Sequence, residues 1–318
     1  MALFAIADLH FAFSVDKPMD IFGENWKNHS EKIIASWKEH ITEEDTVLLP
    51  GDLSWGMRID EAAADLEKNL DKILAKCRKA GVTLYAALPR VAREWNAEAD
   101  QPMIDRLIAS EIDGFLVRAA GQFAQVQKSG KKIVVDYNLN AMNRQTVEYW
   151  KEQGADNVCL SVEANLHEIN RMGDKDCEMV VYGYLPLMKT QQCPIGNYVG
   201  GKDGHKFCTE RSNEDLYFLR DRKGVKFPLM TDCERCVCTI LNGKPLFTLK
   251  FYDEILESTT GLVRLDFTKE GPGRAERIAK AYGEMTADAE RMSPATRNLL
   301  GEMSEKGSTK GHFFRGVE

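Results

Sequence analysis

Short apolar runs rich in β-branched residues alternate with segments of helical spacing along most of the chain. Apolar positions three and four residues apart fill the segments between the runs, as at 146–152, where the pattern stops just before Gly154. Runs that are apolar at nearly every position and are separated by helices are typical of a parallel sheet covered on both faces. The runs that we predict as strands are 2–7, 45–49, 82–88, 114–118, 132–137, 157–161, 178–183 and 262–267.

The number of predicted strands bears on the architecture. Eight parallel strands, each followed by a helix, close a (β/α)8 barrel. We therefore predict an α/β fold like a TIM barrel, with a cysteine-containing insertion at about 184–261 between strands seven and eight. In such a barrel the insertion leaves from the carboxyl-terminal rim, where the sites of this fold are built.

Composition and charge narrow the class of protein. Apolar residues make up 43 % of the 318 residues and charged residues 29 %, an ordinary globular mixture. The net charge of −7 argues against indiscriminate nucleic-acid binding, though not against a local basic patch. One such patch, 220–223 (RDRK) with Lys226, we interpret as a solvated charged turn.

The chain shows no signal for a membrane or for secretion. No apolar run approaches the roughly 20 residues of a membrane-spanning helix. The first residues lack a basic start, and Asp8 and His10 interrupt their apolar stretch, unlike in a signal peptide. We therefore predict a cytoplasmic protein that does not associate with membranes.

Three residues near the start have side chains of the kind that binds a divalent metal ion. Asp8 and His10 are two residues apart at a strand end, so their side chains leave on one side, and Asp52 follows the next strand. A carboxylate there could bridge two metal ions that activate a water for attack on phosphorus, whereas singly each motif is also typical of a helix cap.

The opening resembles the calcineurin-like metallophosphoesterases from Met1 to about Leu70. The matching stretches are "DLHFAFSVDKPMDIFGENW" and "PGDLSWGM". The resemblance implies that Asp8, His10 and Asp52 are ligands of Mn, Fe or Mg. The family's Gly-Asn-His-Asp and Gly-His-x-His motifs do not follow. Because a two-metal site needs more than three ligands, we interpret these residues as a vestigial site and do not expect phosphoesterase turnover.

Five of the eight cysteines fall within the predicted insertion. In a reducing compartment, clustered cysteines are more typical of metal or redox chemistry than of disulfides. Four thiolates suit either a structural zinc or an iron–sulfur cluster, although the spacing is not that of a zinc ribbon. We interpret Cys77, Cys159 and Cys177 as small buried hydrophobes. The cysteines of the insertion are Cys193, Cys208, Cys233, Cys236 and Cys238.

From about Ala80 to Glu318 the chain resembles the C-terminal part of the collagenase-like peptidases of family U32. The matching stretches include "DGFLVRAAGQFA", "KKIVVDYNLNAMN", "VVYGYLPLMKTQQCPIGN", "LRDRKGVKFPLMTDC" and "TKGHFFRGVE". The family's Gly-Ala-x-Cys motif, which would lie upstream, is absent.

The U32 resemblance implies a function and a cofactor. Better-understood members look like iron–sulfur proteins that serve hydroxylation of tRNA, ribosomal RNA or quinone precursors. By the same resemblance, a [4Fe–4S] cluster would be held by Cys193, Cys208, Cys233 and Cys236, with Cys238 the alternative for the last position; zinc is the alternative metal. RNA or a small molecule is then the expected substrate, and the chain is either such a protein or an inactive relative.

The two resemblances together predict a fusion. Residues 1–70 would contribute the first two β/α units, residues 71–318 the U32-like region, and the junction would lie near 68–80 within a predicted helix. A phosphoesterase and a non-catalytic structural or binding module, with zinc or without metal, remain the alternative functions. A partner protein that covers exposed apolar surface is a further expectation, and the oligomeric state is left open.

Polar residues at predicted strand ends are the candidates for substrate contact. Asn138 and Asn140 follow strand five, Glu163 follows strand six, and Arg264 and Asp266 share one face of strand eight. Helix caps and ion pairs at the rim are the alternative roles for these residues. No cysteine–histidine or serine–histidine–aspartate arrangement is evident for peptide hydrolysis.

Overall fold

A computed structural model gives the architecture of the chain. It describes residues 3–5, 46–49, 70–91, 94–198, 217–232, 237–287 and 292–315. Asp8, His10, Asp52, Cys208, Cys233 and Cys236 lie outside the described residues. No helix in the described ranges combines the length and the apolar character needed to cross a bilayer.

The larger sheet is parallel and curled. Six of its strands follow one another through parallel pairings in the order β3, β4, β5, β6, β7 and β13. β1 pairs with β13 and β2, and β2 pairs with β3. The short β12 (Leu246–Phe247) adds an antiparallel edge to β7. The parallel strands are β1 (Leu3–Ala5), β2 (Thr46–Leu49), β3 (Thr83–Ala87), β4 (Gly114–Val117), β5 (Lys132–Val135), β6 (Asn157–Cys159), β7 (Cys177–Gly183) and β13 (Leu262–Asp266).

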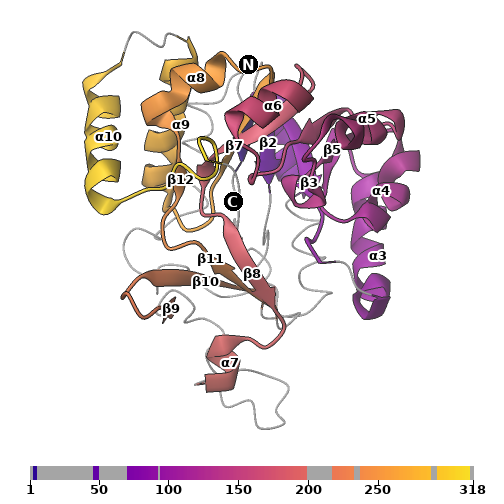
Figure 1. Cartoon of the computed structure of the whole chain (residues 1–318). Helices are drawn as coiled ribbons and strands as arrows, with labels where there is room; N and C mark the ends of the chain where they lie inside the picture. Colours follow the sequence, from indigo (N-terminus) through magenta and orange to yellow (C-terminus); the bar gives the residue numbers. More distant parts are fainter. Residues whose placement is uncertain are drawn as a thin grey trace.

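Helices cover the outer face of this sheet (Figure 1). Several begin at side-chain caps that satisfy free backbone N–H groups, as where Asn143 Oδ1 accepts from Thr146 N at 2.9 Å. The helices are one over 70–79, α3 (Glu94–Ala109), α4 (Ala120–Val126), α5 (Arg144–Glu152), α6 (Leu166–Met172), α8 (Tyr252–Leu256), α9 (Pro272–Ala287) and α10 (Pro294–Lys306), with 3-10 turns at Gln127–Ser129, Tyr137–Leu139 and Leu249–Phe251.

The main core lies between the sheet and its helices. All seven residues of β7 and all four of β4 are buried, which explains why β4 is wholly apolar and why β7 is apolar apart from Glu178. Phe115 and Val117 of β4 belong to this core together with Phe123 of α4. Leu116, which alternation places on the opposite face, packs instead with Tyr85 and Val134 in a separate small cluster on the inner face of the sheet.

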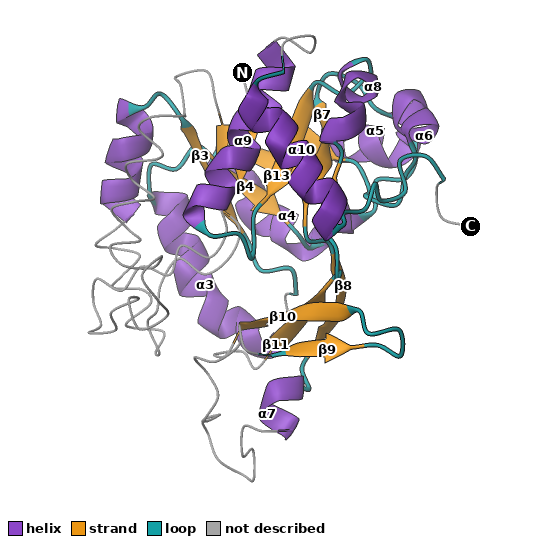
Figure 2. Cartoon of the chain, turned by 90° about the vertical axis from the view of Figure 1, so that its left-hand side faces the viewer, coloured by secondary structure: helices purple, strands orange, loops and turns teal. Residues whose placement is uncertain are grey.

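The chain between β7 and β13 builds a second sheet, which lies apart from the helical layer (Figure 2). It is antiparallel, in the order β8–β11–β10–β9, and α7 (Pro194–Tyr198) follows β8. Ile195 of α7 packs with Leu229, Cys238 and Ile240 on one face of the sheet. Its strands are β8 (Pro186–Thr190), β9 (Phe218–Arg220), β10 (Lys226–Asp232) and β11 (Val237–Leu241).

The predicted α/β class and parallel sheet are confirmed. Each of the eight predicted runs coincides with a strand of the parallel sheet to within a few residues, and the predicted helix at 146–152 is part of α5. Gly154, where that helix was expected to stop, adopts a φ of 102°, in the left-handed region that favours glycine. The sequence did not predict the antiparallel sheet between β7 and β13.

Candidate functional site

Charged residues follow three adjacent strands of the parallel sheet. Arg118 comes directly after β4 and Asp136 directly after β5, whereas Arg90 lies three residues beyond β3. The carboxyl ends of parallel strands meet at one edge of a sheet, which is where α/β proteins bind ligands. The strand order therefore brings these three side chains together.

Arg264 joins this group from β13, a strand that follows much later in the chain. It lies in the middle of β13 and is fully buried. Its Nη1 donates to Asp136 Oδ1 at 2.6 Å, and its Nη2 donates to Glu178 Oε1 of β7. A buried guanidinium is tolerated only with such partners, because its desolvation costs several kcal/mol, of order 5.

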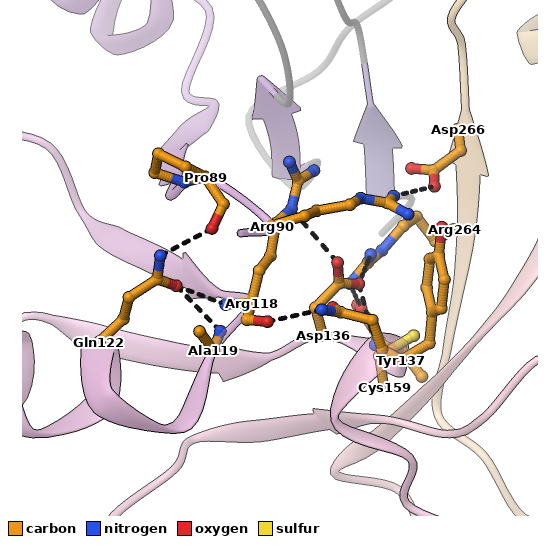
Figure 3. Close-up of polar contacts among 12 residues, drawn as sticks. Pro89, Arg90, Arg118, Ala119, Gln122, Asp136, Tyr137, Cys159, Arg264 and Asp266 are labelled. Atoms are coloured by element: carbon orange, nitrogen blue, oxygen red, sulfur yellow. Dashed lines mark hydrogen bonds and ion pairs between the residues drawn. The ribbon is translucent and has the colours of Figure 1, made fainter. Parts of the chain in front are cut away.

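Further ion pairs connect the remaining members. Arg118 Nε lies 3.2 Å from Asp136 Oδ2, and Arg90 Nη2 lies 3.8 Å from Asp266 Oδ2. The Arg90 guanidinium also lies over the Tyr137 ring, 4.8 Å from its centroid. We call the set Arg90, Arg118, Asp136, Tyr137, Glu178, Arg264 and Asp266 the arginine cluster. Figure 3 labels all of its members except Glu178 and shows their side chains converging from several strands.

The cluster perturbs the ionisation of its own members. Burial alone would raise the pKa of Asp136, but Arg264, Arg90 and Arg118 outweigh burial and lower it. Burial lowers the pKa of Arg118 to about 10, with a contribution from the charge of Arg90, so Arg118 stays charged at neutral pH. Burial raises the pKa of Glu178 despite the opposing effect of Arg264.

The close approach of β7 to the end of β13 fixes Asp266. Gly183, the last residue of β7, has a φ of 141°, and a Cβ added there would lie 2.5 Å from Asp266 O and 2.8 Å from Asp266 Cβ. Only glycine satisfies both the conformation and the space. The carboxylate that faces Arg90 is thus positioned by a glycine on the neighbouring strand.

Gln122 of α4 ties together the two loops that carry Arg90 and Arg118. It is 2 % exposed, and its Oε1 accepts from Arg118 N at 2.9 Å and from Ala119 N at 3.0 Å. Its Nε2 donates to Pro89 O at 2.7 Å (Figure 3). One amide therefore satisfies three backbone groups next to the two arginines.

Replacing Gln122 by leucine is expected to lower the free energy of unfolding by about 1–3 kcal/mol, because backbone groups lose their partners in a buried place. Urea unfolding followed by circular dichroism measures the change. The matched control is Gln127→Leu, which removes an exposed bond from Gln127 Nε2 to Gln153 O and should cost less than about 0.5 kcal/mol. Equal losses for the two variants would contradict a special role for Gln122.

Several buried polar atoms of the cluster have no hydrogen-bond partner among the described residues. They are Arg118 Nε, Asp136 Oδ2, Tyr137 Oη, Arg264 Nε and Asp266 Oδ1, with Asn138 Oδ1 beside them. Arg118 Nε and Asp136 Oδ2 form an ion pair with each other but not a hydrogen bond. Buried polar atoms normally have partners, and guanidinium groups pair with carboxylates and phosphates. The arrangement suits a small anionic ligand at the carboxyl ends of the strands.

The structure brings together some of the predicted contact residues and not others. Arg264 and Asp266 belong to the cluster, and Asn138 adjoins it, where its Nδ2 donates to Arg118 O. Asn140 instead ends the 3-10 turn with a φ of 52°. Glu163 is exposed and takes no part in the contacts of the cluster.

Most members of the cluster were missed by the sequence analysis. Arg90, Arg118 and Asp136 each follow an apolar run closely, in "ALPR", "GFLVR" and "IVVD". That position was the available signal, because a charged residue at the end of a buried parallel strand faces the site edge. Glu178 gives no comparable signal, since it stands inside the buried strand β7.

The described cysteines divide into two groups. Cys77, Cys159 and Cys177 are buried at 4 %, 0 % and 0 % exposure, as predicted. Burial raises the pKa of the Cys159 thiol well above its ordinary value, so this thiol, close to the cluster, is a poor nucleophile. Cys193 is half-buried, whereas Cys238 is fully buried against Ile195. No group of three metal-binding side chains occurs within the described ranges.

Comparison with protein families identifies the relatives of this chain. The model of "Peptidase family U32" matches residues 38–318. That match includes 38–70, which the sequence analysis had assigned to a phosphoesterase opening. The comparisons give no support to a phosphoesterase segment or to a fusion with its junction near 68–80.

Three bacterial proteins show partial sequence similarity. The tRNA hydroxylation protein P of Escherichia coli is 34 % identical over 75 residues, covering 22 % of this chain and 17 % of that protein. The protein of the same name from Haemophilus influenzae is 28 % identical over 109 residues, or 32 % and 23 % of the two chains. The tRNA hydroxylation protein P1 of Bacillus subtilis is 22 % identical over 148 residues, or 44 % and 35 %.

The matched stretches thus span about a third or less of these relatives' own lengths. No solved structure matches the chain significantly.

Proposed function

This chain belongs to peptidase family U32, and we propose that it acts in the hydroxylation of RNA, with a small anionic co-substrate bound at the arginine cluster. The relatives that match it are named for tRNA hydroxylation. The arginine cluster is the observation that carries the proposal, since it brings three guanidinium groups and several buried polar atoms without hydrogen bonds to the carboxyl edge of the sheet.

We further propose that the parallel sheet is a closed (β/α)8 barrel. The support lies in its pairings: β13 pairs with both β7 and β1, β1 pairs with β2, and β2 pairs with β3. Together with the pairings from β3 to β7, they support a sheet that closes on itself. The arginine cluster would then occupy the mouth of the barrel, the usual position of sites in this fold.

The residues of the cluster would bind and orient the anion rather than hydrolyse a peptide. Arg118 remains charged at neutral pH, so it can pair with a carboxylate or phosphate. Burial raises the pKa of Tyr137, so its phenol keeps its proton and can donate a hydrogen bond. Asp136 and Glu178 hold the Arg264 guanidinium in place by accepting hydrogen bonds from its Nη1 and Nη2.

We propose that a [4Fe–4S] cluster is held at one end of the antiparallel sheet by Cys193, Cys208, Cys233 and Cys236. Asp232 pairs with Val237, so the segment that carries Cys233 and Cys236 connects two paired residues. Thr190 pairs with Cys238 at this same end, and Cys193 follows three residues later. The described neighbours of Cys193, Cys233 and Cys236 therefore meet, which fits shared ligation by these three. Such a cluster supplies one-electron chemistry when bound.

Arg118→Met is expected to abolish RNA hydroxylation by the chain. The test is expression in an Escherichia coli strain that lacks tRNA hydroxylation protein P, with hydroxylated tRNA nucleosides measured by mass spectrometry. Wild-type chain should restore the nucleoside, and the variant should leave less than about a tenth of it, because removing a buried hydrogen-bonded charge costs roughly 2–5 kcal/mol of binding.

The matched control is Arg144→Met. Arg144 is exposed on α5 and pairs only with Glu148 among the described residues, at 2.8 Å, so its loss should leave the nucleoside unchanged. Absence of the nucleoside with a folded wild-type chain that contains iron would contradict the proposed function. A role on RNA would also place the protein in the cytoplasm.

A further inference from the structure

The antiparallel sheet carries a basic and aromatic hairpin that the arginine cluster does not use. β9 and β10 pair so that Arg220 lies opposite Lys226 and Phe218 lies opposite Pro228. Residues two apart on a strand share a face, so these four residues lie on one face of the hairpin. Phe227 and Leu229 lie on the other face, which packs in the small apolar core with Ile240.

Positive charge is concentrated on this hairpin. The described part of the antiparallel sheet, from 186 to 241, has five lysines and arginines against two carboxylates, in a chain whose net charge is −7. The cations are Lys189, Arg220, Arg222, Lys223 and Lys226.

The carboxylate of Asp221, which adjoins these cations in the sequence, accepts backbone hydrogen bonds within the turn. Asp221 Oδ1 accepts from Lys223 N at 2.8 Å and from Val225 N at 2.9 Å, so it shapes the turn between the strands. Among the described residues, no carboxylate lies within ion-pair distance of Arg220, Arg222 or Lys223. The turn therefore presents its cations to the solvent.

An aromatic ring stands among these cations. Phe218 is 42 % exposed, and Lys226 Nζ lies 4.2 Å from the centroid of its ring. Exposed aromatic rings among lysines and arginines are the recurring feature of surfaces that bind single-stranded nucleic acid, because bases stack on rings while cations contact phosphates. Figure 2 shows β9 beside β10 at the edge of this sheet.

The hairpin lies at the end of the antiparallel sheet that joins the parallel sheet. A Cβ added at Gly243 would lie 2.7 Å from Val225 Cγ1, so the basic turn packs where β11 leaves the sheet. Asn242 N donates to Leu185 O at 2.8 Å, and Leu185 follows β7 by two residues. A nucleic-acid strand bound to the hairpin would thus lie close to the carboxyl end of β7.

We propose that this hairpin face, made of Phe218, Arg220 and Lys226 with the adjoining turn, binds a single-stranded segment of RNA. The proposal rests on the function proposed above and assigns the substrate a surface of its own. It replaces the interpretation of 220–226 as merely a solvated charged turn.

The test measures binding of the full chain to a fluorescently labelled single-stranded RNA of about 16 nucleotides, by anisotropy over a range of salt concentrations. Arg220→Ala with Lys226→Ala should reduce the slope of log affinity against log salt by about 1.4, since each phosphate contact on a single strand contributes about 0.7. Phe218→Leu should weaken binding about tenfold without changing the slope, because it removes a stacking ring and no charge.

The matched control is Lys128→Ala with Lys250→Ala, which removes two exposed charges elsewhere on the chain. Equal weakening by the control pair and the hairpin pair, with unfolding midpoints unchanged, would overturn the proposal. So would failure of the wild type to bind at about 50 mM salt. If RNA binding depends on the hairpin but the chain restores no hydroxylated nucleoside, the result supports this inference and contradicts only the proposed function.

Discussion

Replacing Arg264 by methionine is expected to lower the free energy of unfolding by about 3–5 kcal/mol. The substitution keeps a long apolar side chain but leaves Asp136 and Glu178 without their shared partner in a place that water does not reach. Chemical denaturation at neutral pH measures the loss. The control is Arg144→Met, whose exposed pair with Glu148 is worth less than about 0.5 kcal/mol.

The stability lost in Arg264→Met should also depend on pH, and the direction of that dependence identifies its cause. Asp136 has a lowered pKa in the folded protein, so its stabilising contribution is present above the ordinary aspartate value of about 3.9 and disappears as the pH falls through the folded value. The difference in stability between wild type and Arg264→Met should therefore shrink below about pH 4. A difference that stays constant down to pH 3 would mean that lost packing, not charge, explains the variant.

The sequence predicted the parallel sheet well because its physical signal is local. A strand buried on both faces is apolar at nearly every position, as in β4 and β7, and no knowledge of its neighbours is needed to recognise it. Arg264 and Asp266 were predicted as site residues for a related reason. They interrupt the apolar sequence "LVRLDF" on one face.

The partners in the cluster could not be predicted in the same way. Arg264 and Asp136 are 128 residues apart in the chain, and their contact depends on how the sheet curls. Glu163 has the same sequence signal as Asp136, a carboxylate shortly after a strand, yet its loop leaves it exposed. Position after a strand therefore narrows the candidates, and only the tertiary arrangement selects among them.

The phosphoesterase interpretation failed to gain support for a similar reason. A buried strand followed by a turn and an aspartate recurs throughout α/β proteins, so "LLPGDLSW" is compatible with several families. The U32 match, by contrast, extends over most of the chain and begins at residue 38. A short local pattern carries less information than agreement across many elements.

Cys236→Ser is expected to remove nearly all iron from the protein, whereas Cys238→Ala is expected to retain it. We propose four thiolates as ligands, and wild-type chain purified without oxygen should then contain about four iron and four acid-labile sulfide per chain. Cys193→Ser should lose iron as Cys236→Ser does. Iron, sulfide and the visible absorption spectrum provide readouts that do not depend on activity.

The contrast between Cys236 and Cys238 follows from the packing of the antiparallel sheet. Cys238 is fully buried in the small apolar core with Ile195 and Ile240, so alanine should lower stability by about 1 kcal/mol and leave the metal in place. Loss of iron in Cys238→Ala with Cys236→Ser unaffected would reverse the assignment of the fourth ligand. If the protein instead contains zinc, and the same serine variants lose it, the proposed ligands stand and the role of the metal is structural rather than redox.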